Sequence, residues 1–156
     1  MIIIQRPGQD LLEMDFILMD FEGTLAQDRR VDPKAKDKIN LLSKRMKIYI
    51  LAKGEKEVVE DVLKKVKAEV IYLRERETAQ RKLSLLQQLG ARRTVAIGNG
   101  VDDAPMLEEA GLGICILGRE GASVEAMQKA DVVVTNILDA LDFILKPLRQ
   151  EATLGL

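Results

Sequence analysis

The sequence lacks histidine and tryptophan, and it holds a single cysteine among its 156 residues. Without histidine, no imidazole is available as a general base or as a metal ligand. The lone Cys115 excludes an intrachain disulfide and lies in an apolar stretch, which indicates an inert core residue. Aromatic residues make up only 3% of the chain, too few for a platform that stacks nucleic-acid bases.

An excess of charge of one sign is also absent. The chain has 24 Lys and Arg residues against 25 Asp and Glu residues, and this net charge of −1 does not favour nucleic acid or an acidic membrane as a partner. The apolar runs are too short to span a bilayer, and Met1–Ile4 lacks the charged leader of a signal peptide. We therefore expect a cytoplasmic protein without nucleic-acid or membrane partners.

Short apolar stretches alternate with amphipathic stretches along the whole chain. Strands are predicted at 16–19, 48–51, 70–73, 94–97, 114–117 and 132–134. This alternation predicts an α/β fold, a Rossmann-like doubly wound parallel sheet with helices on both faces. The length suits a single domain, 1–156, with a core of about 15–147.

The segments between the predicted strands are mostly predicted to be helices. A helix starts at Asp32-Pro33, another covers about 56–67, and the last begins at Asn136 and stops at Pro147. The Pro7-Gly8 pair predicts the turn of an N-terminal hairpin at the edge of the sheet. Because residues 52–82 have room for only one helix and one short strand, no cap domain is expected over the sheet.

The most informative motif is Asp-Phe-Glu-Gly-Thr-Leu, from Asp20 to Leu25, directly after an apolar strand. In open parallel sheets, ligands bind at the carboxyl ends of the strands. A carboxylate on a glycine turn at that position is suited to act as a nucleophile or a metal ligand for a phosphate compound. The alternative is an aspartate that merely caps the turn.

A second acidic glycine turn follows another predicted strand and runs from Gly98 to Leu107. If the two strands are neighbours, Asp20, Asp102 and Asp103 come within reach of one ion. Oxygen ligands without histidine or cysteine suit a hard cation, and Mg²⁺ fits best. The two motifs together favour a functional site over a turn cap.

The stretch Asp20 to Leu25 resembles the first motif of the haloacid-dehalogenase (HAD) superfamily, which includes phosphatases and the phosphorylation domains of P-type ATPases. The stretch Gly98 to Leu107 resembles the superfamily's fourth motif, Gly-Asp-Gly-x-Asn-Asp-x-x-Met-Leu. The chain is most similar to the small capless proteins called soluble P-type ATPases. Their Glu-Gly-Ala-Ser-Val-Glu-Ala stretch is matched by 120–126 and their Asp-Ala-Leu-Asp tail by 139–142.

The resemblance assigns a role to most polar residues of both motifs. Asp20 is implied as the nucleophile, Glu22 as the acid and base, and Lys82 as the cation that offsets the added phosphate charge, with Arg81 and Lys53 as alternatives. The expected phosphate-binding residues are Gly23, Thr24, Ala52, Lys53 and Lys82. The expected metal-binding residues are Asp20, Glu22 (through its backbone carbonyl), Asn99, Asp102 and Asp103.

The chain departs from the superfamily pattern at four positions. Glu22 replaces the usual aspartate, and Ala52 replaces a serine or threonine whose hydroxyl binds phosphate. Asn99 replaces a metal-binding aspartate, while Asp102 replaces an asparagine and restores one charge from a different place. These changes bear on catalytic rate, because the loss of one preorganised donor costs roughly a hundredfold.

Two functions therefore remain in competition. The first is a Mg²⁺-dependent phosphohydrolase that forms an aspartyl-phosphate at Asp20 and acts on a small phosphorylated substrate. The second is a catalytically weakened module that binds Mg²⁺, phosphate or a partner without turnover. A response-regulator receiver is disfavoured, because a receiver needs an acidic pair near the start of the chain and no acidic residue closes the first strand region before Asp20. The resemblance to capless proteins also implies that the open site takes larger substrates or is closed by a neighbouring subunit, and we therefore expect a homo-oligomer.

Overall fold

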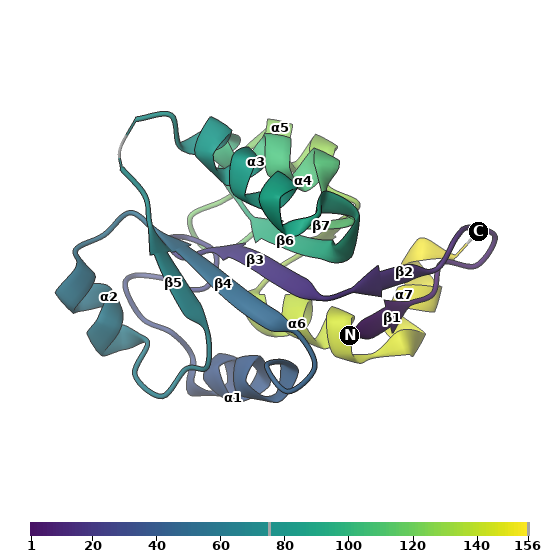
Figure 1. Cartoon of the computed structure of the whole chain (residues 1–156), viewed down its shortest axis with the longest axis horizontal. Coiled ribbons are helices and arrows are strands. Elements are labelled where there is room, and N and C mark those ends of the chain that lie inside the picture. The colour runs from purple at the N-terminus through teal and green to yellow at the C-terminus, as the bar shows by residue number, and fades with distance from the viewer. Residues whose placement is uncertain (75, 156) are drawn as a thin grey trace.

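The structure is a computed structural model that describes residues 1–74 and 76–155 (Figure 1). Its centre is one parallel sheet, which confirms the predicted α/β fold and doubly wound topology. From edge to edge the sheet runs β5 (Glu69–Tyr72), β4 (Lys47–Ala52), β3 (Phe16–Asp20), β6 (Thr94–Gly98), β7 (Leu112–Ile116) and β8 (Val132–Val134).

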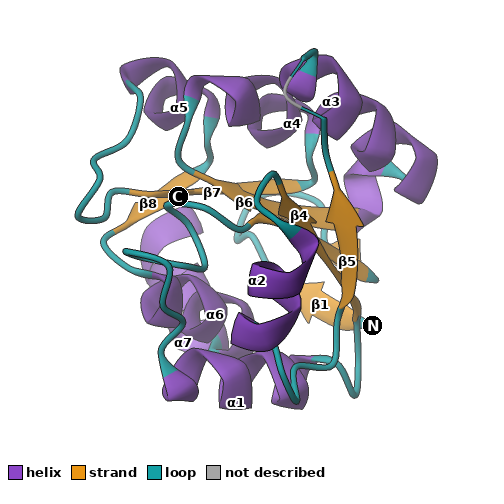
Figure 2. Cartoon of the chain, turned by 90° about the vertical axis from the view of Figure 1, so that its left-hand side faces the viewer, coloured by secondary structure: helices purple, strands orange, loops and turns teal. Residues whose placement is uncertain are grey.

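Helices cover both faces of the sheet (Figure 2). One face carries α1 (Pro33–Leu42), α2 (Lys56–Val62), α6 (Ile137–Leu145) and α7 (Pro147–Leu154). The other carries α3 (Thr78–Leu89), α4 (Ala104–Glu109) and α5 (Val124–Lys129). Short 3₁₀ turns, η1 (Ala91–Arg93) and η2 (Val101–Asp103), flank β6. No described helix combines the length and the apolar character needed to cross a membrane.

The apolar composition of β3 follows from its burial on both faces. Successive side chains of a strand point to opposite faces. Accordingly, Ile17 and Met19 join the core under α1 and α6, whereas Leu18 joins the core under α3 and α4. All three are fully buried. A strand covered on both sides needs apolar residues at every position, and this explains the continuous run before Asp20.

The predicted hairpin forms, but it stands apart from the sheet edge. Strands β1 (Ile2–Ile4) and β2 (Leu12–Met14) pair only with each other in an antiparallel sheet. Because β2 leads directly into β3, which already has β4 and β6 as partners, the hairpin has no free edge beside it. Its apolar side chains pack on the larger core instead.

One helix prediction was wrong in extent, and one helix was not predicted. Helix α2 ends at Val62 and not near Lys67, because the chain turns at Lys65, whose φ is 64°. Helix α7 was not predicted, since Pro147 was interpreted as a stop. Proline lacks the backbone N–H, and in the first turn of a helix this group has no partner within the helix. Pro147 therefore follows the end of α6 and begins α7.

The sheet order brings the two acidic motifs together. Strands β3 and β6 are parallel neighbours, with Phe16 opposite Thr94 and Met19 opposite Ile97. Their carboxyl ends therefore lie side by side, and the turns that follow them share one end of the sheet. This confirms the expected adjacency and places Asp20 next to the η2 turn.

Candidate active site

Lys82 is the centre of the polar cluster at this end of the sheet. It extends from α3 with no exposed surface. Its Nζ lies 3.0 Å from Asp20 Oδ1, 2.7 Å from Asp103 Oδ1 and 3.1 Å from Asp102 Oδ2. A lysine is rarely buried without carboxylate partners, and Lys82 has three of them, so it is a buried cation of this cluster and not a solvated surface lysine.

Asp103 shapes the turn after β6. Its Oδ2 accepts hydrogen bonds from the backbone N–H groups of Asn99 (2.9 Å) and Gly100 (3.0 Å). The carboxylate packs so closely on Gly98 that a Cβ there would overlap it. Glycine at position 98 is therefore required for this turn, and both oxygens of Asp103 already have partners.

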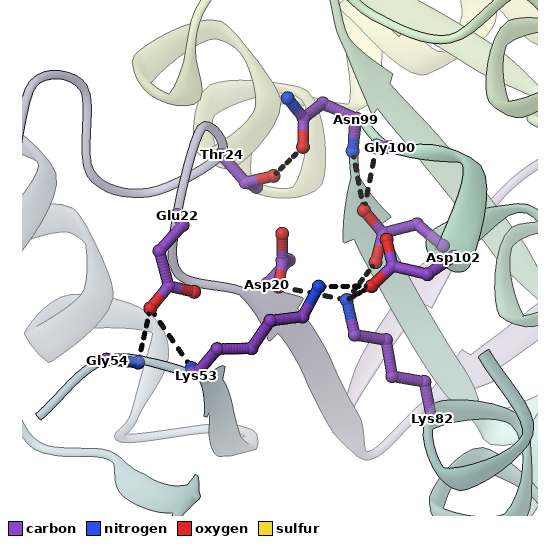
Figure 3. Close-up of polar contacts among 10 residues, drawn as sticks. Asp20, Glu22, Thr24, Lys53, Gly54, Lys82, Asn99, Gly100 and Asp102 are labelled. Atoms are coloured by element: carbon purple, nitrogen blue, oxygen red, sulfur yellow. Dashed lines mark hydrogen bonds and ion pairs between the residues drawn. The ribbon is translucent and has the colours of Figure 1, made fainter. Parts of the chain in front are cut away.

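Asp102 connects two lysines that come from different elements. Its Oδ2 lies 2.6 Å from Lys53 Nζ and 3.1 Å from Lys82 Nζ. Figure 3 shows the Lys53 side chain reaching across the site toward the acidic turn. Burial opposes ionisation of Asp102, but the two lysines lower its pKa to about 2. Asp102 is thus a charged bridge between Lys53 and Lys82.

Glu22 lies on the other side of Asp20. Its Oε1 accepts hydrogen bonds from the backbone N–H groups of Lys53 (3.0 Å) and Gly54 (2.9 Å). Its Oε2 is buried and has no hydrogen-bond partner among the described residues. In Figure 3 this second oxygen points to the side on which Asp20 lies. The carboxyl group is therefore held at one oxygen, while its other oxygen is buried without a hydrogen-bond partner and is called the open oxygen below.

The Gly23 turn lies against the Asn99 side chain. A Cβ on residue 23 would come within 2.7 Å of both Asn99 Nδ2 and Glu120 Oε2, and the φ of 75° also favours glycine. Thr24 is fully buried, and its hydroxyl donates to Asn99 Oδ1 at 3.2 Å. This hydroxyl is therefore partnered within the protein.

The cluster has more negative than positive charge. Burial, followed by the neighbouring Asp103 carboxylate, raises the pKa of Asp20 from 3.8 to about 8, against the lowering effect of Lys82. Burial lowers the pKa of Lys82, but Asp20, Asp103 and Asp102 together raise it above its usual value. Lys82 is consequently charged, whereas burial first and the neighbouring carboxylates second oppose the ionisation of Asp20.

This shift predicts how the stability of the metal-free protein depends on pH. Between about pH 4 and pH 8, folded Asp20 holds a proton that the unfolded chain releases. Raising the pH therefore favours unfolding, by at most about 1.4 kcal/mol per pH unit. Urea denaturation in a chelator at several pH values measures this slope. We expect Asp20→Asn to flatten it, and an equal slope in both proteins would contradict the assignment to Asp20.

The residues present fit a divalent cation by charge more clearly than by geometry. Asp20, Glu22, Asp102 and Asp103 carry four negative charges if all ionise, and two lysines offset only half of them. Among residues 1–74 and 76–155, however, no three acidic or cysteine side chains are grouped as a ready-made metal site. Mg²⁺ usually keeps several waters and takes only one or two carboxylates plus substrate phosphate, and this cluster satisfies that requirement.

Most predicted site residues come together, but they differ in whether their polar groups are free. Asp20, Glu22, Lys53, Lys82 and Asp102 form the interior of the cluster. Three other predicted residues have no free polar group in their side chains. Asp103 and the Thr24 hydroxyl already have hydrogen-bond partners, and the buried Ala52 has no polar side-chain atom. Arg81, the alternative to Lys82, is exposed on α3.

The sequence did not single out Arg29 or the contact that Glu120 makes. Glu120 lies beside Gly23 and Asn99, although the sequence showed it only as part of the 120–126 stretch. Arg29 belongs to a tight turn in which both Asp28 and Arg29 have positive φ, at 52° and 62°. No glycine or Asn-Gly pair marks this turn, so no sequence signal reveals it.

Comparison with solved structures shows which fold this is. The 3-deoxy-D-manno-octulosonate 8-phosphate phosphatase of Moraxella catarrhalis superposes with a TM-score of 0.71 at 16% identity, over 86% of this chain and 87% of that one. The corresponding cobalt-bound Haemophilus influenzae phosphatase gives 0.70 at 16% identity, over 90% and 91%. A HAD-superfamily phosphatase of Bacteroides thetaiotaomicron gives 0.66 at 13% identity, over 84% and 93%.

Sequence comparison adds one relative of unknown function. No family model matches the chain. An uncharacterized protein of Methanocaldococcus jannaschii, MJ0073, is 42% identical over 76 residues, which are 46% of this chain and 82% of the relative. The chain therefore belongs to the same family as MJ0073, and it shares its fold with the solved phosphatases above, one of which is a HAD-superfamily phosphatase.

Proposed function

We propose that the protein is a Mg²⁺-dependent phosphohydrolase that forms an aspartyl-phosphate at Asp20 and acts on a small phosphomonoester. The observation that carries this proposal is the buried Asp20–Lys82 pair, 3.0 Å apart, with the open oxygen of Glu22 on its other side. The fold shared with a Moraxella catarrhalis phosphatase crystallised with magnesium and phosphate supports the same chemistry.

The first chemical step uses Asp20 and Glu22. A carboxylate oxygen of Asp20 attacks the phosphorus atom, and the bond from phosphorus to the ester oxygen breaks. Glu22, in its protonated form, gives its proton to that leaving oxygen. In the second step a water attacks the same phosphorus, Glu22 takes the proton of the water, and the bond to Asp20 breaks. Phosphate is released, and both carboxyl groups return to their starting state.

The remaining residues hold the phosphate and its charge. Lys82 offsets the negative charge that accumulates beside Asp20, and Lys53 brings a second cation to the same side. The backbone N–H groups of Gly23 and Thr24 already donate to the carbonyl oxygens of Ala26 (2.9 Å) and Phe21 (3.4 Å), so Lys82 and Lys53 supply the donors to the phosphate. Mg²⁺, when bound, supplies the further positive charge that four carboxylates and a phosphate require, and Asp20 with Asp102 would hold it.

Glu22→Gln tests the proton transfer. The amide oxygen can still accept from Lys53 and Gly54, but glutamine cannot exchange the proton. With an aryl phosphate, whose leaving group needs no acid, the phosphoenzyme should form and then persist. We expect steady-state turnover to fall about a hundredfold or more, with a burst of released phenol in rapid-mixing kinetics. Glu57→Gln, an exposed control on α2, should behave like the wild type.

Phosphate release from a phosphomonoester panel, with and without Mg²⁺, tests the whole proposal. Mg²⁺-dependent release is the expected result. Absence of turnover, with Mg²⁺ and beryllofluoride still bound in calorimetry, would overturn it in favour of the second candidate.

That second candidate is a module that captures phosphate without hydrolysing it. Two observations favour it: Ala52 has no hydroxyl at the end of β4, and Glu22 already occupies the N–H groups of Lys53 and Gly54. In either case we propose a homo-oligomer whose neighbouring subunit covers the capless site, and the mass in light scattering measures this.

A further inference from the structure

A cavity of about 440 Å³ begins at Glu22 and extends away from the buried cluster toward α2. Phe21, Val58 and Val62 form its apolar walls, while Arg29 and Lys53 line it with positive charge and Glu55 with negative charge. A larger hollow of about 730 Å³ lies between residues 25–33 and 118–138, but none of Asp20, Glu22, Lys53 or Lys82 lines it. The smaller cavity thus shares two lining residues, Glu22 and Lys53, with the candidate active site.

The position of the open oxygen of Glu22 indicates which part of a substrate would lie in this cavity. If Asp20 attacks phosphorus and Glu22 protonates the ester oxygen, that oxygen must lie near Glu22 Oε2, which is buried and without a partner. The rest of the leaving group must then extend from Glu22 into open space. The cavity lined by Glu22, Val58 and Arg29 supplies that space.

The walls of the cavity favour an apolar body. Val58 is 46% exposed although its neighbour Val59 is buried, and Phe21 contributes a ring that is only 5% exposed. An exposed valine beside a hollow with apolar walls is a surface that gains by contact with a ligand. A fully hydroxylated leaving group would leave its polar groups without partners along this wall.

Arg29 places a positive charge at the rim of the cavity. It is exposed at the tip of the turn after the first motif, where its φ is 62°. The carboxylate of the adjacent Asp28 is directed to Arg119, at 3.9 Å. Within residues 1–74 and 76–155, no carboxylate forms an ion pair with Arg29. This guanidinium is therefore available to an anionic group of a ligand.

We propose that this cavity, here called the Val58 pocket, binds the leaving group of the substrate, and that the substrate is an amphiphilic monophosphate. Its apolar body lies on Val58 and Val62, and a second anionic group, such as a carboxylate, pairs with Arg29. This assignment of substrate class rests on the proposed phosphohydrolase function. Arg29 and Val58 act by binding and take no part in proton or phosphoryl transfer.

A series of ω-carboxyalkyl monophosphates, compared with alkyl monophosphates of matching length, tests the pocket. At the best length, wild-type kcat/KM should favour the carboxylated compound about three- to fivefold, as a partly exposed ion pair allows. In Arg29→Ala this ratio should fall to about one. Val58→Asp should lower kcat/KM for both compounds, on the order of tenfold, by removing apolar contact and repelling the anion. Lys44→Ala, an exposed basic residue outside the pocket, should keep the wild-type ratio.

Calorimetric binding of the same compounds to Asp20→Asn separates this inference from the proposed function. The same preference in binding, lost in Asp20→Asn/Arg29→Ala, supports the pocket even if the wild type hydrolyses nothing. Turnover that is indifferent to chain length, to the carboxylate and to both pocket variants would overturn the pocket while the phosphohydrolase function stands.

Discussion

Replacing Asp20 by Asn is expected to lower Mg²⁺-dependent phosphate release by at least about a thousandfold, because the amide cannot attack phosphorus. Asp20 is only 5% exposed and lies at the end of the central strand, so asparagine fits the same space. The variant should therefore fold. Phosphate release, measured with the substrate that the wild type hydrolyses best, is the readout.

Two controls make the Asp20→Asn result specific. Acid-quenched wild type should retain labelled phosphate on the protein, while the variant should retain none. Asp10→Asn, whose side chain is 84% exposed on the N-terminal hairpin loop, should retain wild-type activity. Full activity in Asp20→Asn would contradict the aspartyl-phosphate mechanism, whereas lost activity in a misfolded variant would be recognised by urea denaturation.

Replacing Lys82 by Met is expected to lower the free energy of unfolding more than any of the other substitutions described above. Methionine fills the space of the buried lysine stem, but it leaves Asp20 and Asp103 without their cation in a site closed to water. Removing one partner of a buried ion pair typically costs about 3–5 kcal/mol, because the remaining charge stays uncompensated. The free energy of unfolding in urea at neutral pH measures this effect, and phosphate release should be lost as well.

The matched control for Lys82 is its neighbour on the same helix. Arg81→Ala removes an exposed cation from α3, and we expect a change within about 0.5 kcal/mol. Excess Mg²⁺ should partly restore the stability of Lys82→Met, since a divalent ion can neutralise the same carboxylates. A Lys82→Met protein as stable as the wild type would show that the three carboxylates do not depend on this lysine.

Local sequence pattern was enough to predict the frame of the site. The apolar run before Asp20 specifies a strand buried on both faces, and the glycine turns after β3 and β6 mark where the chain can place carboxylates. Asn136 and Gly90 likewise mark helix ends by their side-chain and backbone chemistry. The sequence placed Asp20 near the 98–103 turn only on the condition that their strands are neighbours, and the pairing of β3 with β6 meets that condition.

The partners of each charge required the tertiary structure. Nothing in the sequence indicates that Asp102 bridges Lys53 and Lys82. Nor does it indicate that one oxygen of Glu22 accepts hydrogen bonds from the backbone N–H groups of Lys53 and Gly54. These contacts join residues far apart in the chain, and their geometry depends on how α3 and the β4–α2 turn pack. Helix α7 also escaped prediction, because proline has the same local signal when it ends a helix and when it begins one.

The sequence by itself thus determined the class of fold, the two acidic turns and the chemistry that oxygen ligands without histidine can support. These depend on residue type and on periodicities of a few residues, which the chain shows directly. Only the tertiary structure decided which cation neutralises Asp20, which oxygen of Glu22 stays open, and which wall the Val58 pocket presents. Those features depend on burial and on distances between elements, because desolvation and ion pairing act through space and not along the chain.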